Sequence, residues 1–181
     1  EIEDIKKVYD YALSLGNFRE LVVSTRPDCI TPEICDLLLS YVKLGYDVWV
    51  ELGLQSSNNS TLDYINRGHS YEDFLVAFQL LKKYNIKITV HLIFGLPKES
   101  ASDIFKSVED LSRLKPNGVK FHNLHIPTGT KMYEEYLRGE LSFPSSSRHA
   151  EYVAKAIEMM YQETIIMRIT TDTPGSRHSV P

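Results

Sequence analysis

Apolar residues recur along this chain at two alternating spacings, one typical of strands and one typical of helices. Short runs rich in Val, Ile and Leu predict five strands, over residues 20–25, 48–55, 86–94, 119–126 and 164–170. The segments between these runs carry apolar residues every three or four positions. That spacing predicts amphipathic helices, each with one face against a sheet.

Capping residues mark where several of these helices begin. Thr31 followed by Pro32 predicts one start, because the hydroxyl caps free N–H groups and proline suits the first helical turn. Residues 70–73 and 100–103 each place a serine three positions before an aspartate, which predicts a capping box. Further helices are predicted over residues 2–15 and 148–162.

Strands that alternate with helices predict a parallel sheet, since a parallel pair needs a long crossover connection. We therefore expect an α/β fold, a parallel (β/α) partial TIM-type barrel, with residues 1–181 as a single domain. A complete (β/α)8 barrel typically takes ~250 residues. This chain has 181 residues. Its length therefore predicts only part of such a barrel.

Each predicted strand has one apolar and one polar face. In residues 48–55 the even positions are all Val or Leu, whereas the odd positions include Glu51 and Gln55. Successive side chains point to opposite faces, so the polar faces are expected inside the barrel, near the carboxyl ends of the strands where such folds bind ligands. The residues expected to converge there are Ser24, Arg26, Glu51, Gln55 and His91. The alternative is an antiparallel sheet with its polar face in water.

Composition is that of an ordinary soluble protein, with 43% hydrophobic and 24% charged residues. The net charge of −4 argues against a general nucleic-acid binder, and no apolar run approaches the ~20 residues of a membrane span. Cys29 and Cys35 lack the spacing of zinc or iron–sulfur ligands. The acidic start is unlike a secretory signal, so we expect a cytoplasmic protein with both thiols reduced.

Two short motifs place histidine or glycine near predicted strand ends, and a third, which contains Arg67, lies between a short helix and the cap of the next helix. His122 and His125 are three positions apart and face opposite sides of a strand, so we expect His125 at the site and His122 as a hydrogen-bonded structural residue. Arg67 is either a solvated loop charge or a ligand for a carboxylate. Gly95, followed by Leu-Pro, either lets the main chain approach a ligand closely or forms a simple turn.

Together these motifs resemble the radical S-adenosylmethionine (SAM) superfamily. The segments that carry the resemblance are residues 24–29 (Ser-Thr-Arg-Pro-Asp-Cys), 51–56 (Glu-Leu-Gly-Leu-Gln-Ser), 66–69 (Asn-Arg-Gly-His), 91–97 (His-Leu-Ile-Phe-Gly-Leu-Pro) and 120–125 (Lys-Phe-His-Asn-Leu-His). The resemblance runs from about Glu20 to Thr173. Within the superfamily, the sequence is similar to the branch that holds the oxygen-independent coproporphyrinogen oxidases and the elongator-type tRNA-modifying enzymes.

The resemblance implies SAM as a cofactor and assigns ligands to it position by position. Gln55 and Arg67 match side chains that contact the ribose and the methionine carboxylate of SAM, and Ser24 lies where relatives hold the methionine end. His91 matches a ribose-binding position that is often acidic in relatives. The positions that match the adenine side are Gly95, Pro97 and Leu124. The candidates for binding the substrate are Arg26, Glu51 and His125, and no residue is assigned to a metal.

One part of the family pattern is missing from this sequence. The family needs a C-x3-C-x2-C run that holds a 4Fe-4S cluster, and an electron from the cluster cleaves SAM into methionine and a 5′-deoxyadenosyl radical, which abstracts hydrogen from the substrate. Neither that run nor the glycine-rich segment that binds the SAM amino group is present. The resemblance therefore implies an internal fragment, the central to C-terminal part of the barrel, which is inactive alone, with the 4Fe-4S cluster only in the full-length protein.

Two other function classes stay open. One is a non-catalytic, barrel-derived binding or scaffold module, and the other is a barrel enzyme with cluster-free chemistry, for which no nucleophile–base pair stands out. The expected substrate is a small molecule or a tRNA, because the fold alone does not fix it. The first strand of a fragment would expose an unpaired edge, which predicts self-association.

Overall fold

A computed structural model describes residues 1–171 and 179–180, so Thr173, where the resemblance ends, lies outside the described residues. The elements in chain order are α1 (Ile2–Ser14), β1 (Glu20–Thr25), the 3-10 turn η1 (Pro27–Cys29), α2 (Pro32–Lys43), β2 (Asp47–Gln55), α3 (Asn59–Tyr64), α4 (Tyr71–Lys83), β3 (Lys87–Phe94), α5 (Ala101–Leu114), β4 (Gly118–Asn123), β5 (Ile126–Pro127), α6 (Lys131–Leu137), α7 (Ser146–Met159), β6 (Ile165–Arg168) and β7 (Ser179–Val180).

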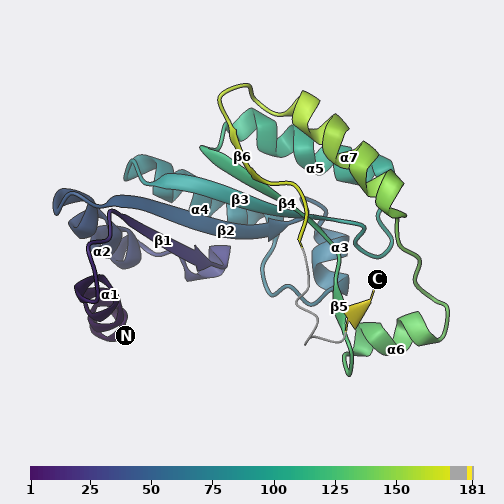
Figure 1. Cartoon of the computed structure of the whole chain (residues 1–181), viewed down its shortest axis with the longest axis horizontal. Helices are drawn as coiled ribbons and strands as arrows, with labels where there is room; N and C mark the ends of the chain where they lie inside the picture. The colour runs from purple at the N-terminus through teal and green to yellow at the C-terminus, as the bar shows by residue number, and fades with distance from the viewer. Residues whose placement is uncertain (172–178, 181) are drawn as a thin grey trace. The chain divides into compact units, whose positions relative to one another are not determined.

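Five strands hydrogen-bond into one sheet in the order β1-β2-β3-β4-β6 (Figure 1). β1 and β2 run parallel with Ser24 opposite Glu51, and β4 and β6 also run parallel. A separate antiparallel ribbon pairs β5 with β7. The predicted α/β fold with parallel strands that alternate with helices is thus confirmed, and the antiparallel alternative is wrong.

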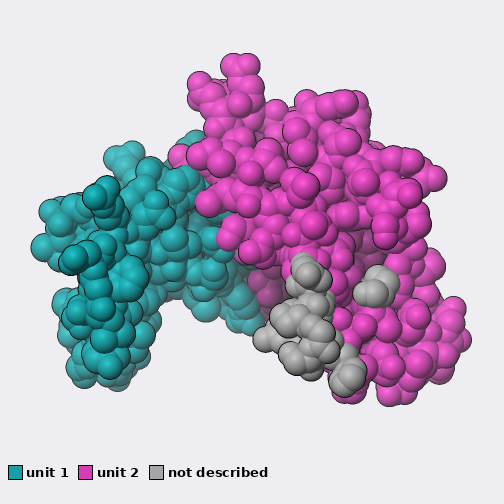
Figure 2. Space-filling model, viewed as in Figure 1, with its two compact units in different colours: residues 1–54, 69–90 teal, residues 55–68, 91–181 magenta. Residues whose placement is uncertain are grey.

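The chain forms two compact units, coloured separately in Figure 2. Unit 1 comprises residues 1–54 and 69–90, and unit 2 comprises residues 55–68 and 91–181. Each unit contains part of the sheet and its own helices. The predicted site residues are therefore divided between the two units.

Unit 1 buries the apolar face of β2 as its alternating pattern predicts. The even positions, from Val48 to Leu54, are at most 3% exposed. Phe74 and Phe78 of α4 are fully buried with their ring centroids 5.7 Å apart. The helix starts agree with the capping residues, since the Thr31 hydroxyl accepts from the main-chain N–H of Ile34 and a capping box opens α4.

Unit 2 packs α5 and α7 side by side over β4 and β6 (Figure 1). Phe94 and Phe121 stack with centroids 5.2 Å apart, and Phe105 of α5 meets the ring of Tyr152 of α7 edge-on. Each such aromatic side chain removes a large apolar area from water, so these contacts dominate the stability of the unit. The predicted capping box at the start of α5 is present.

The chain departs from the predicted pattern after β4. That strand ends at Asn123, not at residue 126; the N–H of Leu124 donates to the O of Phe94 at 3.1 Å, and Phe94 is the last residue of the neighbouring strand β3. The short helix α6 and the β5–β7 ribbon come next, neither of which the apolar spacing predicts. α6 buries no residue, so it carries no apolar stripe to recognise.

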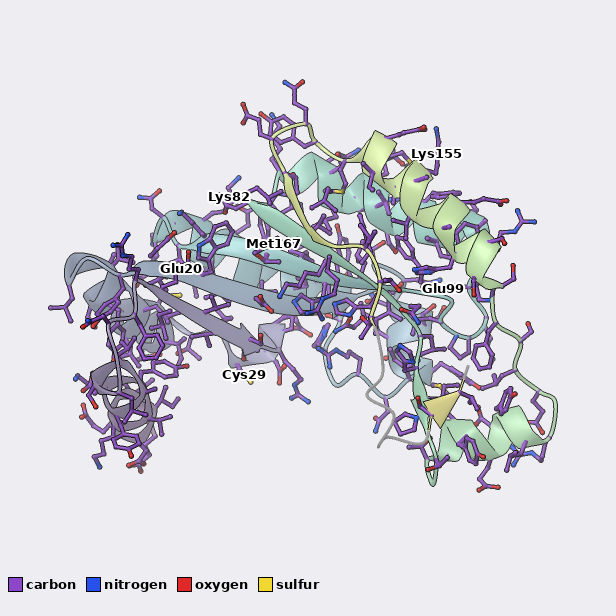
Figure 3. The ribbon with its side chains drawn as sticks, viewed as in Figure 1. Glu20, Cys29, Lys82, Glu99, Lys155 and Met167 are labelled. Atoms are coloured by element: carbon purple, nitrogen blue, oxygen red, sulfur yellow. The ribbon has the colours of Figure 1, made fainter. Side chains whose placement is uncertain are left out.

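Both cysteines are free thiols. Cys29, labelled in Figure 3, is exposed in the 3-10 turn, and Cys35 is buried in α2, where burial raises the pKa of its thiol to about 11. Within the part of the chain that the structure describes, no helix has the length and apolar character that crossing a membrane requires.

Candidate functional site

The predicted site residues fall into both units. Unit 1 holds Ser24, Arg26 and Glu51, and unit 2 holds Gln55, Arg67, His91, Gly95, Pro97, Leu124 and His125. The convergence of all ten residues stays a prediction. Within each unit, their local contacts are defined.

In unit 1 the carboxyl ends of β1 and β2 bring two predicted residues together. Ser24 lies directly opposite Glu51, and its hydroxyl donates to Glu51 Oε2 at 3.0 Å. The glutamate is 7% exposed, whereas the serine is exposed. With its proton directed to the carboxylate, the hydroxyl oxygen keeps its lone pairs for a donor group of a ligand.

Arg26, predicted to bind a substrate, has an acidic partner that the sequence did not indicate. Its Nε donates to Asp28 Oδ1 at 2.9 Å and its Nη2 to Oδ2 at 2.5 Å. This two-pronged pairing lowers the pKa of the Asp28 carboxyl. The guanidinium is thereby held just beyond the end of β1.

His69 anchors the start of α4 to β2 within unit 1. Its Nε2 lies 3.1 Å from Gly53 O and its Nδ1 lies 3.1 Å from Ser70 O. The ring is buried at 7% exposure. The segment with the sequence Asn-Arg-Gly-His therefore ends in a structural anchor, a role that sequence reasoning missed.

In unit 2 Gln55 adopts a conformation that glycine usually supplies. Its φ is +73° at the last position of β2, and a residue with a side chain stays there only when its surroundings hold it. The next residue, Ser56, is 1% exposed. Ser57 is held through its N–H, which donates to Ser107 Oγ of α5 at 2.9 Å.

Arg67 follows α3, and the end of that helix fixes its main chain. Its N–H donates to Leu62 O at 2.9 Å, and Asn66 before it turns the chain with a φ of +53°. The residue is half-buried. Because its guanidinium is half-buried and its turn is anchored, Arg67 is better suited to bind a carboxylate than a freely solvated loop arginine would be.

A cavity of about 460 Å³ lies among α3, the ends of β3 and β4, and α6. Its volume is within the range of small-molecule sites. Leu124 and His125 line it, as predicted, together with Asn66, the neighbour of Arg67. Leu96 and Ile126 add apolar wall, and these two residues were missed by sequence reasoning because only their packing against Leu124 reveals them.

The Gly95–Pro97 turn has a structural reason for its glycine. Gly95 has a φ of +90°, and a Cβ there would lie 2.9 Å from Pro144 Cδ. Both Gly95 and Pro97 are buried. Of the two sequence interpretations, tight turn chemistry therefore accounts for Gly95.

Three histidines gather at the ends of β3 and β4. The rings of His91 and His122 stack with centroids 4.9 Å apart. His122 Nδ1 lies 2.5 Å from Thr171 Oγ1, and His125 Nε2 lies 3.0 Å from Thr171 O. Because β4 ends between them, the two histidines do not diverge as an unbroken strand would require, and that prediction is wrong. The predicted hydrogen-bonded role of His122 is confirmed.

Glu99 is a functional candidate that sequence reasoning missed. It lies in the loop between β3 and α5 and is labelled in Figure 3. Its Oε1 accepts from the Ser56 hydroxyl, and the Thr61 side chain also interacts with the carboxylate. Burial raises the pKa of this carboxyl group above its ordinary range. Carboxyl groups with a shifted pKa are candidates for functional sites.

The raised pKa of Glu99 predicts how stability changes with pH. Between an ordinary carboxyl pKa of about 4 and the raised value, the folded protein binds more protons than the unfolded one, so the free energy of unfolding falls as pH rises. Glu99→Gln removes this titration but keeps an oxygen acceptor. We expect the variant to have the higher melting temperature at pH 8 and a smaller advantage at pH 4. An equal difference at both pH values, measured by thermal melts, would contradict the assignment.

Within residues 1–171 and 179–180, no three His, Cys, Asp or Glu side chains are grouped so that they could hold a metal ion. The histidines at β3 and β4 are held by the hydrogen bonds to Thr171 and by ring stacking.

Comparisons with known families agree with the motifs. A family model described as "Radical SAM superfamily" matches residues 1–111. A second model, described as "Radical_SAM C-terminal domain", matches residues 116–181.

Similar proteins with longer chains are found in archaea and bacteria. The uncharacterized protein MJ0486 of Methanocaldococcus jannaschii is 35% identical over 94% of this chain and 53% of its own length. The tRNA uridine(34) acetyltransferase of the same organism is 34% identical over 86% of this chain and 29% of its own length. This chain thus spans about half the length of the first of these relatives.

Two solved structures resemble the fold. The archaeal Methanocaldococcus infernus Elp3 with an N-terminal deletion matches with a TM-score of 0.76 and 34% identity, over 87% of this chain and 37% of the Elp3 chain. Coproporphyrinogen III oxidase (HemN) from Escherichia coli matches with a TM-score of 0.57 and 16% identity, over 77% and 31% of the two chains. At that identity the HemN likeness concerns the fold alone. The predicted resemblance to this branch is confirmed.

Proposed function

Because the chain belongs to the radical SAM superfamily, we propose that it forms the SAM-binding part of a longer radical SAM enzyme whose cluster is held by another segment. One observation supports this most. Gln55, Arg67 and Leu124, which the resemblance assigns to SAM, belong to one compact unit. There the main chain around Gln55 and Arg67 is anchored, and Leu124 lines a cavity of suitable volume.

The residues of unit 2 suit the chemical groups of SAM. Leu96, Leu124 and Ile126 form an apolar cluster for a flat adenine ring. Arg67 supplies a cation for the methionine carboxylate, and the Gln55 amide supplies donors and an acceptor for ribose hydroxyls. With a reduced 4Fe-4S cluster, bound SAM supplies a 5′-deoxyadenosyl radical for hydrogen abstraction. The part of this chain is to bind and orient the cofactor.

We propose that the cysteines of the cluster precede this chain in the longer protein. Cys29 and Cys35 are separated by five residues, which is not the spacing of the family. Sequencing the gene upstream of Glu1 is expected to show an in-frame C-x3-C-x2-C within about one hundred residues, the part of a barrel that remains. An upstream sequence without it favours the scaffold module. We place the protein in the cytoplasm, where its free thiols stay reduced.

Reconstitution with iron and sulfide tests the division of labour between segments. This chain alone is expected to stay colourless, because its two cysteines are too few for the cluster and one of them is buried. The longer protein is expected to turn brown under the same anaerobic conditions. A stable brown cluster on this chain, seen by visible absorbance, would contradict the proposal.

We propose tRNA as the substrate of the longer protein, in preference to a small molecule. The support is the 34% identity to a protein named tRNA uridine(34) acetyltransferase. The rate of 5′-deoxyadenosine formation by the reconstituted longer protein is the measurement. Intact tRNA is expected to raise it, and ribonuclease treatment of the tRNA is expected to remove the effect. A rate that is unchanged by tRNA favours a small-molecule substrate.

We also propose that this chain self-associates through β1. The strand lies at an edge of the sheet, and Val22 on it is 47% exposed. Edge strands with apolar side chains pair with other chains unless a charge intervenes. Light scattering at micromolar concentration is expected to give a dimer or larger species, which Val22→Lys shifts toward the monomer.

The matched control for this prediction is Val42→Lys, at a position that is 38% exposed on α2 and outside the sheet. It adds the same charge without blocking the strand edge, so the assembly is expected to persist. A monomeric wild-type chain would contradict self-association.

A further inference from the structure

The turn after β2 carries a conformation that needs support. Gln55 has a φ of +73° although it is not glycine, and such residues persist only where neighbouring contacts over-determine the main chain. The supports are found in residues 56–58 and their partners, all within unit 2. They identify which groups hold Gln55 in place.

One set of supports comes from α5. Ser57 donates through its N–H to Ser107 Oγ at 2.9 Å and through its hydroxyl to Asp110 Oδ2 at 3.0 Å. Ser107 is 3% exposed. These bonds fix the middle of the turn against a regular helix, but they do not reach α3 or Arg67.

The other support is Glu99, which contacts both sides of the site. Its carboxylate accepts from the Ser56 hydroxyl, and the oxygen of that hydroxyl accepts from the N–H of Asn58 at 3.0 Å. The Thr61 side chain on α3, which is 3% exposed, also interacts with this carboxylate and partly offsets the rise in its pKa. One partly buried group therefore joins the residue after Gln55 to Asn58, the cap of the helix that leads to Arg67.

The loop of Glu99 is itself fixed. Its N–H donates to Leu96 O at 3.2 Å, Lys98 before it has a φ of +67°, and the capping box of α5 follows at Ser100. Glu99 is partly buried, and even partial removal of a carboxyl group from water is costly and raises its pKa. Because of this cost, the presence of the Glu99 carboxylate is better explained by its contacts with Ser56 and Thr61 than by a contribution to packing.

We propose that Glu99 is a positioning residue for SAM: through Ser56 and Thr61 it holds the main chain that presents Gln55 and Arg67 to the cofactor. This inference rests on the proposed function, since it takes Gln55 and Arg67 as SAM ligands. Glu99 touches neither SAM nor the substrate, and it acts only through the two segments that it joins.

The test measures SAM affinity of the reconstituted longer protein by calorimetry for three variants. Glu99→Ala removes the hydrogen bond from Ser56 and the interaction with Thr61, and it is expected to weaken SAM binding about tenfold or more. Glu99→Gln keeps an acceptor oxygen and is expected to stay within about threefold of the wild type. Ser100→Ala is the matched control. It removes the cap of α5, the helix that follows Glu99, and lowers the stability of that helix without touching Ser56 or Thr61.

A purely structural role predicts a different pattern. If Ser100→Ala weakens SAM binding as much as Glu99→Ala at the same loss of melting temperature, helix stability explains the effect and the inference is overturned. Unchanged affinity in Glu99→Ala, or equal losses in Glu99→Ala and Glu99→Gln, also overturns it. If Glu99→Ala does not fold, Ser56→Ala combined with Thr61→Val removes the same bonds from the other side and is judged by the same criteria.

Amide hydrogen exchange separates this inference from the proposed function. In Glu99→Ala the amides of Ser57, Asn58 and Arg67, all hydrogen-bonded in the wild type, are expected to exchange about tenfold faster or more, with no such change in Ser100→Ala. If the wild type does not bind SAM, the proposed function fails, and the exchange rates still decide whether Glu99 holds these segments. Unchanged exchange would refute the positioning role.

Discussion

Arg67→Ala is expected to weaken SAM binding by the reconstituted longer protein about 100-fold. Removing a charged partner from a partly buried ion pair costs about 2–5 kcal/mol, and each 1.4 kcal/mol is tenfold in affinity. Arg67 is half-buried and its main chain is fixed to α3. A movement of a neighbouring loop is therefore not expected to bring another cation to its position. Arg67→Lys is expected to recover part of the loss, because an ammonium keeps the charge without the two-pronged geometry. Calorimetric titration with SAM is the measurement.

The control is Arg113→Ala on α5. Arg113 pairs with Glu109 on the exposed face of that helix and is 66% exposed, so its removal is expected to change SAM affinity by less than about twofold. Equal affinities of Arg67→Ala and wild type would contradict the assignment of Arg67 to the cofactor.

Phe121→Ala is expected to lower the free energy of unfolding by about 3–5 kcal/mol, as large-to-small changes at fully buried aromatic positions do. Phe121 is 0% exposed and stacks on Phe94 at the centre of unit 2. It also precedes His122 on β4, so its loss is expected to loosen the strand end that carries the histidines. Urea unfolding followed by circular dichroism is the measurement.

Phe121→Leu is the companion variant, because it keeps most of the buried volume and is expected to cost less than the alanine change. A loss below about 1 kcal/mol for Phe121→Ala, the size of an ordinary substitution, would contradict the packing of β4 against β3.

Much of the fold follows from short-range rules. The alternation in β2 predicted that its apolar side chains are buried, because side chains alternate across any strand and the apolar set is at most 3% exposed; the burial of Glu51 on the other face was not predicted. The capping boxes at Ser70 and Ser100 were predicted from two residues each, since both partners lie within one helical turn. The parallel direction of the strands was predicted from the helices between them, because a parallel pair needs a long crossover connection.

The parts that could not be predicted depend on contacts between distant residues. β4 ends at Asn123, next to the point where its neighbour β3 ends at Phe94, thirty residues before Leu124. Glu99 gains its importance from Ser56 and Thr61, which lie about forty positions away along the chain. No local pattern distinguishes Glu99 from an ordinary solvated acid in a loop. Only its burial and its two partners do.

The central claim is that this chain binds SAM for radical chemistry, and 5′-deoxyadenosine formation tests it most directly. The longer protein, with its cluster reconstituted and reduced by dithionite without oxygen, is expected to convert SAM to 5′-deoxyadenosine and methionine, and Arg67→Ala is expected to lose nearly all of this activity. A protein with an intact, reduced cluster that forms no 5′-deoxyadenosine from SAM, with or without tRNA, would contradict the account.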